Sequence, residues 1–174
     1  MKKFITLNLV AAFILSTSFI YAQPKEFKII GSTTGFIDST LLYLEYILNE
    51  ESSKNLDSAY IISGEFVFKG KLKSKVIRVL IRTQNNSDYK FLWVDNSKIS
   101  FKAEKGKFRD AVVTGSKTQS EADKLYAAIK VGKNKKEQYI SFIRSHRNSI
   151  ISAHLLSVYS SSWGKDTTAT LYNS

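Results

Sequence analysis

The hydrophobic pattern of the chain changes once, near Gly115. From Glu26 to Thr114, apolar and polar residues alternate in short runs that are rich in β-branched and aromatic side chains and separated by Gly, Asn, Asp and Ser. A period of two residues is typical of strands with one buried face. We therefore expect strands at Phe27–Gly31, Leu41–Ile47, Ser58–Ile62, Glu65–Leu72, Val76–Arg82, Tyr89–Val94, Lys98–Ala103 and Ala111–Thr114.

Ser63 and Gly64 connect two of these expected strands. A two-residue connection with Gly supplies the positive φ angles of a tight hairpin, so we expect Ser58–Ile62 and Glu65–Leu72 to pair antiparallel. Alternation in the second strand places Phe66 and Phe68 on a buried face and Glu65, Val67 and Lys69 on the other. The same reasoning predicts buried faces formed by Ile77, Val79 and Ile81 and by Phe91 and Trp93.

After Gly115 the apolar spacing becomes helical. Ser116 with Gln119, or Thr118 with Glu121, fits the capping box of a helix start. Asn134 and Asn148-Ser149 open two further helices, and Asp166 caps a short fourth one. The apolar residues at helical spacing are Ala122, Leu125 and Ile129, then Ile140 and Ile143, then Ile151, Leu155 and Val158.

This order, strands first and helices afterwards, predicts an α+β fold rather than an alternating α/β one. We expect an antiparallel β-sandwich or barrel-like domain followed by a small helical segment. The expected organisation is a signal peptide at 1–22, the β domain at 23–115 and the helical segment at 116–174.

The first 22 residues have the pattern of a cleavable secretory signal. Lys2 and Lys3 precede an apolar stretch from Phe4 to Phe19, and Ala22 offers a small residue at the cleavage point. The alternative is a retained membrane anchor, but a spanning helix needs about 20 predominantly apolar residues and this stretch is shorter. We expect export to the periplasm or cell envelope, and no integral membrane protein after cleavage.

Composition narrows the possible functions. The 174 residues include 26 Lys and Arg against 15 Asp and Glu, a formal net charge of +11, and no Cys. The chain itself therefore has neither disulfides nor a thiol site. In an exported protein, basic charge favours an acidic glycan or a lipid headgroup over nucleic acid, and the alternative is a solvated basic surface.

No set of residues in the sequence predicts a catalytic, cofactor-binding or metal site. His146 and His154 are the only histidines, and eight positions on one helix would separate them by about 12 Å. Zinc needs three or four ligands, and the serines lack a Gly-x-Ser-x-Gly elbow. Glu50 and Glu51 follow a strand, where neighbouring side chains point apart, so shared acid–base chemistry is not expected. We predict no cofactor.

Two surface patterns remain as binding candidates. Lys69, Lys71, Lys73 and Lys75, here called the lysine ladder, would line one face of an extended chain. The ladder could bind an anionic surface or protect an edge strand from pairing, and we favour the second. The aromatic residues of the β half form either a core or an exposed sugar platform, and we favour the core. They are Phe27, Phe36, Tyr43, Tyr46, Tyr60, Phe66, Phe68, Tyr89, Phe91, Trp93 and Phe101.

An ordered series of short motifs resembles a known family. It includes the Gly64-Glu65-Phe66-Val67-Phe68-Lys69-Gly70 hairpin strand, Phe91-Leu92-Trp93-Val94-Asp95-Asn96 and Gly115-Ser116-Lys117-Thr118-Gln119. These look like the uncharacterised β domain that precedes thioredoxin-like domains in the TlpA/ResA-like, AhpC/TSA-superfamily thiol–disulfide interchange proteins of Bacteroidota. In those proteins a Cys-x-x-Cys pair in the thioredoxin-like domain does the chemistry, and this sequence contains no such pair.

The resemblance implies a non-catalytic exported accessory module that positions or regulates a thioredoxin-like partner domain or protein. The alternative that the charge pattern supports is an independent envelope-binding module for an acidic glycan or lipid headgroup.

Overall fold

The computed structural model describes residues 26–47, 52–132 and 134–173. The predicted signal peptide and the pair Glu50-Glu51 lie outside these residues. All eight expected strands are present, with ends that differ by a few residues from the prediction. They are β1 (Phe27–Thr34), β2 (Leu41–Ile47), β3 (Ser53–Tyr60), β4 (Glu65–Gly70), β5 (Val76–Thr83), β6 (Tyr89–Asp95), β7 (Lys98–Glu104) and β8 (Val112–Thr114).

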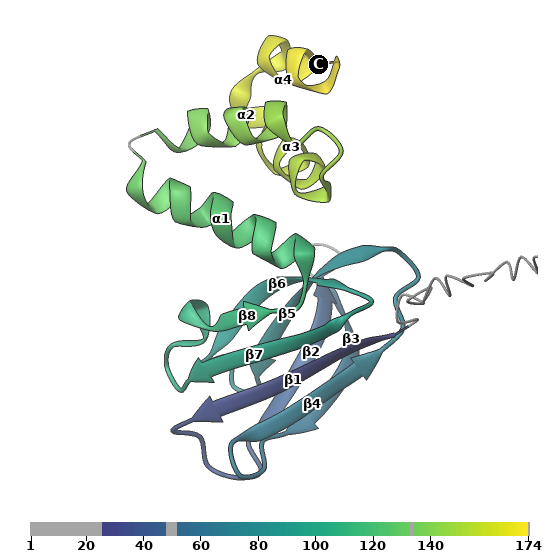
Figure 1. The fold of residues 1–174 in the computed structure, drawn as a ribbon, viewed down its shortest axis with the longest axis vertical. Helices are drawn as coiled ribbons and strands as arrows, with labels where there is room; N and C mark the ends of the chain where they lie inside the picture. Colours follow the sequence, from purple (N-terminus) through teal and green to yellow (C-terminus); the bar gives the residue numbers. More distant parts are fainter. Residues whose placement is uncertain (1–25, 48–51, 133, 174) are drawn as a thin grey trace, which may run out of the picture.

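The strands form two four-stranded sheets that face each other as a sandwich (Figure 1). One sheet has the order β4-β1-β7-β8 and the other the order β3-β2-β5-β6. Neighbouring strands are antiparallel except β1 and β7, which pair in parallel. The α+β class is confirmed, while the expectation of purely antiparallel pairing is wrong for this pair. A parallel pair needs a long crossover, and the chain between β1 and β7 supplies it by forming the four strands of the second sheet and β4 of the first.

The core lies between the two sheets and is built from one face of each strand. In β4 the predicted alternation is confirmed, because Phe66 and Phe68 are buried while Glu65, Val67 and Lys69 are exposed. The ring of Phe66 lies directly over Gly31 of β1, where an added Cβ would come within 2.0 Å of the ring. A glycine in the middle of a strand is therefore required here by close packing.

The Ser63-Gly64 turn is present, but the hairpin predicted from it is wrong beyond the turn. Both residues have positive φ, 51° and 78°, and Ile62 and Glu65 form a single antiparallel bridge. Further along, β3 pairs with β2 in one sheet and β4 pairs with β1 in the other. A turn fixes only the residues beside it, and each strand then takes the partner that lets it bury its apolar face.

The predicted buried face of β6 is also wrong in part. Leu92 and Val94, not Phe91 and Trp93, point into the sandwich core. Phe91 is exposed, whereas Trp93 is buried on the outer face of the sheet by the helical segment. Alternation could not assign the inner face because β6 is apolar on both sides.

Four helices follow the sandwich, with a short 3₁₀ turn, Phe108–Asp110, before β8. Ser116, Asn134 and Ser149 cap the first three helices, as predicted, by accepting hydrogen bonds from backbone amides. Thr118 lies inside the first helix, and Asp166 lies in the first turn of the fourth rather than at its cap. The helices are α1 (Lys117–Val131), α2 (Lys135–Ser145), α3 (Ile150–Trp163) and α4 (Lys165–Asn173).

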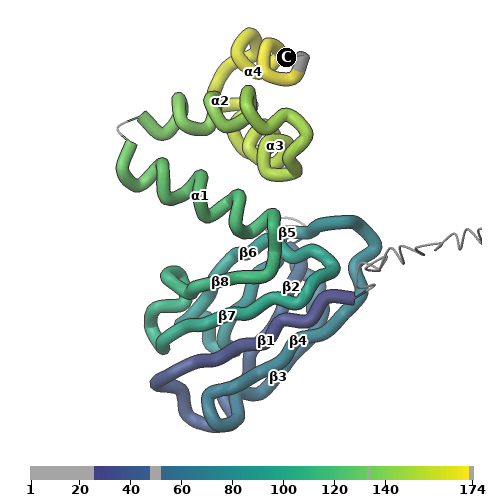
Figure 2. The backbone as a smooth tube through the Cα atoms, viewed as in Figure 1, coloured from purple at the N-terminus to yellow at the C-terminus, as the bar shows by residue number. Residues whose placement is uncertain are grey.

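The helical segment stands at one end of the sandwich, with α1 nearest to it and α4 farthest away (Figures 1 and 2). Its own core includes Trp93 of β6 together with buried residues of all four helices. Among residues 26–47, 52–132 and 134–173, no helix combines the length and apolar character needed to cross a membrane.

Candidate functional site

Helix α1 is joined to β6 by buried polar contacts. The side-chain oxygen of Gln119 accepts a hydrogen bond of 2.7 Å from the backbone amide of Trp93, and its amide group donates to Asp123. The cap residue Ser116 donates to Asp95 of β6 at 3.0 Å. The predicted capping residues thus serve a second purpose, because they fix the direction in which the helices leave the sheet.

A groove of about 750 Å³ lies between the outer face of the β3-β2-β5-β6 sheet and helix α3. Its floor comes from β5 and β6, with Arg78, Phe91 and Trp93, and its opposite wall comes from Ile150, His154 and Val158 of α3. We refer to these six residues as the Arg78 groove. The sequence patterns did not predict this groove, although an arginine inside the apolar run Val76-Ile77-Arg78-Val79-Leu80-Ile81 is a visible signal.

Arg78 lies on the floor of the groove without a carboxylate partner. Its guanidinium carbon stands 4.2 Å from the centre of the Phe91 ring, and its Cα pairs across the sheet with Trp93. Among the described residues no Asp or Glu forms an ion pair with it. Burial lowers the pKa of Arg78, and Tyr126 and Tyr159 oppose that shift. An arginine stays protonated nonetheless, so the groove contains a permanent, partly desolvated positive charge.

His154 faces the same space from α3. Its ring meets Trp93 edge-on, with 5.5 Å between the ring centres. Burial lowers the pKa of His154, and the charge of Arg78 lowers it further. The neutral form is therefore favoured, and the fixed charge of the groove belongs to Arg78.

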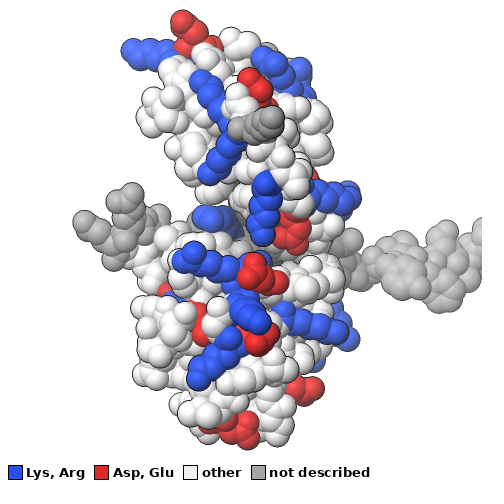
Figure 3. Space-filling view, turned by 90° about the vertical axis from the view of Figure 1, so that its left-hand side faces the viewer, with Lys and Arg blue, Asp and Glu red and all other residues white. Residues whose placement is uncertain are grey.

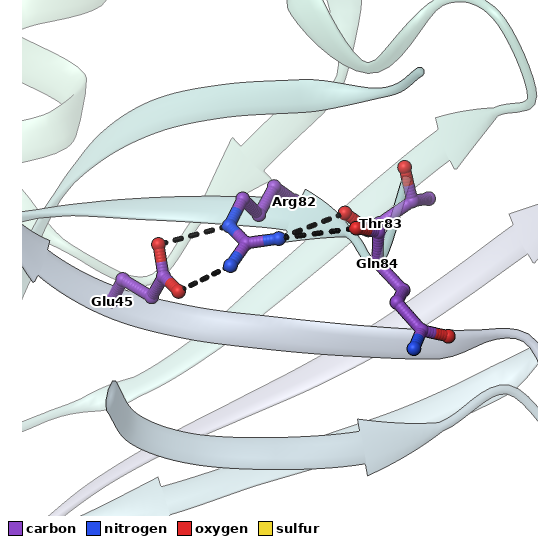
Figure 4. Close-up of polar contacts among 4 residues, drawn as sticks. All are labelled: Glu45, Arg82, Thr83 and Gln84. Atoms are coloured by element: carbon purple, nitrogen blue, oxygen red, sulfur yellow. Dashed lines mark hydrogen bonds and ion pairs between the residues drawn. The ribbon is translucent and has the colours of Figure 1, made fainter. Parts of the chain in front are cut away.

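Arg82 lies four residues along β5 on the same face and, unlike Arg78, is surrounded by hydrogen-bond acceptors (Figure 4). Its Nε and Nη2 atoms donate to the two carboxylate oxygens of Glu45 at 2.9 Å and 2.6 Å. Its Nη1 atom reaches the carbonyl oxygens of Thr83 and Gln84. The hydrogen bond to Glu45 raises the pKa of Arg82.

The lysine ladder does not lie on one strand. Only Lys69 belongs to β4, and Lys71, Lys73 and Lys75 lie in the connection to β5, because β4 ends at Gly70. All four are exposed. Strand β4 is at the edge of its sheet, which is where a protective lysine would stand.

The sheet instead brings together three lysines that are distant in the sequence. Lys28 of β1 pairs across the sheet with Lys69 of β4 on one side and with Lys98 of β7 on the other. We call these three residues the lysine row. All three are exposed, and among the described residues none of them forms an ion pair. Elsewhere, on the side shown in Figure 3, Lys and Arg side chains over the sandwich are interspersed with Asp and Glu.

The two histidines lie on different elements. His146 ends α2 and stacks on Phe142 with 4.3 Å between ring centres, whereas His154 lies within α3. In the part of the chain that the structure describes, no three His, Asp or Glu residues are grouped closely enough to hold a metal ion.

The aromatic residues of the β half divide between core and surface. Phe27, Phe66, Phe68 and Phe101 are buried in the sandwich, as predicted, while Tyr46, Tyr60 and Phe91 are exposed. Of these exposed aromatic residues, Phe91 and Tyr46 line the same groove.

Comparison with protein families shows where the chain belongs. Residues 27–122, which run from the first residue of β1 into α1 and make up more than half of the chain, match the family described as "Domain of unknown function (DUF4369)". No curated protein matches the chain. The match includes the whole sandwich, the Gly64–Gly70 strand and the Ser116 cap, so the chain belongs to the DUF4369 family.

Proposed function

We propose that this protein is an exported, non-catalytic accessory module that positions or regulates a thioredoxin-like partner. The observation that carries the proposal is the rigid attachment of the helices to the sandwich. The buried amide of Trp93 is bound by Gln119, and the Ser116 cap is bound to Asp95. A module that positions a partner needs such a fixed angle between two bodies.

The sequence resemblance supplies the identity of the partner, and the family match supports the domain itself. Export follows from the signal-like residues 1–22, and a chain without Cys needs a partner for thiol–disulfide exchange. The two proteins therefore have different roles. This chain provides the scaffold, and the partner provides the dithiol.

The test uses the purified chain and an exported TlpA/ResA-like protein of the same organism. We expect saturable binding by calorimetry and an altered rate of insulin reduction by the partner. Replacing Gln119 by Leu should weaken both effects because the helices lose their fixed angle, while Ser120→Ala, an exposed change on the same helix, should leave them unchanged. Thiol turnover by the chain alone, or no binding to the partner, would contradict the proposal.

A second function is favoured by the lysine row. Lys28 stands directly opposite Lys69 on one neighbouring strand and Lys98 on the other, an arrangement that costs stability unless an anion neutralises it. In an exported protein this surface suits the phosphates of lipid headgroups or an acidic glycan.

Liposome sedimentation tests this second function. We expect the chain to bind vesicles of phosphatidylglycerol and phosphatidylcholine more tightly than vesicles of phosphatidylcholine alone, with an affinity that falls as salt rises. The variant Lys28→Gln/Lys98→Gln should lose most of this binding. The variant Lys73→Gln/Lys75→Gln removes the same charge from the connection after β4 and should retain it. Equal loss in both variants would show a general charge effect and reject the lysine row as the site.

A further inference from the structure

The Arg78 groove combines a single fixed positive charge with apolar walls. Three of its apolar residues are open to solvent, Phe91 by 39%, Ile150 by 44% and Val158 by 51%. They come from β6 and α3 and lie around one space of about 750 Å³. Pockets for small ligands have volumes of about 300–1,000 Å³ and are mostly apolar with a few polar groups that fix orientation.

The charge in this groove is not neutralised by the described residues. The guanidinium of Arg78 contacts the face of Phe91 and is partly buried, while the titratable groups that interact with its charge are Tyr126, Tyr159 and His154. None of these carries a negative charge at neutral pH. A partly desolvated charge is costly when it lacks a counter-ion, so a bound anion would be stabilised here more than on an open surface.

The same sheet shows how an arginine is satisfied when the chain supplies the partner. Arg82 donates hydrogen bonds to both carboxylate oxygens of Glu45 and to two backbone carbonyl oxygens. Arg78 lies on the same strand and pairs across the sheet with Trp93, and among the described residues it has no carboxylate partner. Charge complementarity therefore favours, as a ligand for this groove, a carboxylate attached to an apolar body.

We propose that the Arg78 groove binds an amphiphilic carboxylate of the fatty-acid type. Its carboxylate pairs with the guanidinium of Arg78, and its hydrocarbon chain lies against Phe91, Ile150 and Val158. This proposal does not depend on the partner named above, because it concerns a small ligand and a different surface from the lysine row.

The test is calorimetric titration of the full chain with laurate below its micellar concentration. Dodecanol, which has the same chain without charge, and dodecyltrimethylammonium, which has the opposite charge, serve as comparison ligands. We expect laurate to bind at one site at least tenfold more tightly than either. Fluorescence of Trp93 in a Trp163→Phe background should change on binding, because Trp93 forms part of the groove.

Two variants test the role of the arginine. Arg78→Gln should weaken laurate binding at least tenfold and leave dodecanol binding unchanged, while the exposed Arg144→Gln should change neither. Val158→Glu places a carboxylate at an exposed position of the groove and should also abolish laurate binding, with Val158→Gln as its control. This second variant keeps the test valid if Arg78→Gln does not fold.

Three results would overturn the proposal. The first is equal affinity for laurate and dodecanol, and the second is unchanged laurate binding in Arg78→Gln. The third is binding that appears only in Glu50→Gln/Glu51→Gln, because Arg78 would then serve the chain's own acidic pair and not an external carboxylate.

Discussion

The two ends of the outer face of the β3-β2-β5-β6 sheet use the same residue type in different ways. At one end Arg82 is bound by Glu45 and two backbone carbonyl groups, and it also lies over the ring of Tyr43. At the other end Arg78 lies under α3, over Phe91, without a carboxylate among the described residues. The first arginine stabilises the sheet, whereas the second leaves a charge available in a groove.

The two arginines differ because different residues lie against the two ends of the sheet. Glu45 is itself 7% exposed, so the Arg82 end is neutralised within the sheet. The Arg78 end faces helix α3 across a groove, and the helix residues that line it, Ile150, His154 and Val158, are not acidic. A comparison between the two ends therefore separates a structural arginine from a binding one.

The largest expected effect is at the Arg82 end. Replacing Arg82 by Gln leaves the nearly buried carboxylate of Glu45 without its counter-ion, so we expect a loss of about 2–3 kcal/mol in the free energy of unfolding. Urea denaturation measures it. The exposed pair of Lys107 and Glu104 provides the control, because Lys107→Gln at a fully solvated pair should leave the free energy of unfolding nearly unchanged. Equal losses would mean that the Arg82 pair is not structural.

A somewhat smaller loss of stability is expected at the contact between α1 and β6, which attaches the helices to the sandwich. Gln119→Leu leaves the buried amide of Trp93 without an acceptor, which should cost about 2 kcal/mol. Because Trp93 would become more exposed, its fluorescence emission should shift to longer wavelength. Ser120→Ala should show neither change. An unchanged stability in Gln119→Leu would show that the helices are held by apolar contacts alone.

A third and smaller effect, at the Arg78 end, is the pH dependence of stability that His154 causes. Burial lowers the pKa of His154 below its unfolded value of about 6.5, so the unfolded chain binds a proton first as the pH falls. The stabilisation from keeping His154 neutral is present above about pH 6.5 and is lost as the pH falls from there toward the folded pKa. His154→Gln should flatten this part of the stability profile measured by thermal unfolding. A profile identical to that of the wild type would show that His154 does not contribute.

The smallest expected effect is that of Arg78 on stability. Arg78→Gln removes a contact with Phe91 worth about 1 kcal/mol but also removes the cost of a partly buried charge. We expect the free energy of unfolding to change by less than about 1 kcal/mol. If the loss instead equals that of Arg82→Gln, Arg78 is structural and the contrast between the two ends fails.

Local signals in the sequence predicted the elements well. The alternation in Glu65–Gly70 gave the buried Phe66 and Phe68, and the caps at Ser116, Asn134 and Ser149 gave the helix starts. Each of these signals depends on neighbours within about four residues, which the sequence displays directly.

Pairing between distant segments was harder to predict. The Ser63-Gly64 turn was correct, but β3 and β4 lie in different sheets. Alternation in β6 could not show that Trp93 faces the helices, because Leu92 and Val94 on its other side are equally apolar. The lysine ladder was proposed from spacing along one strand, while the lysine row comes from three strands.

The sequence by itself determined the overall composition and the local features: a basic chain without Cys, strands followed by helices, and the residues that start the first three helices. Only the tertiary structure decided which charges stand together and which are neutralised. Strand pairing places Lys28 between Lys69 and Lys98 and brings the carboxylate of Glu45 to Arg82. Arg78 lines the groove beside α3 and has no carboxylate partner among the described residues. The reason is physical, since charge interactions fall off with distance in space, and the sequence lists only distance along the chain.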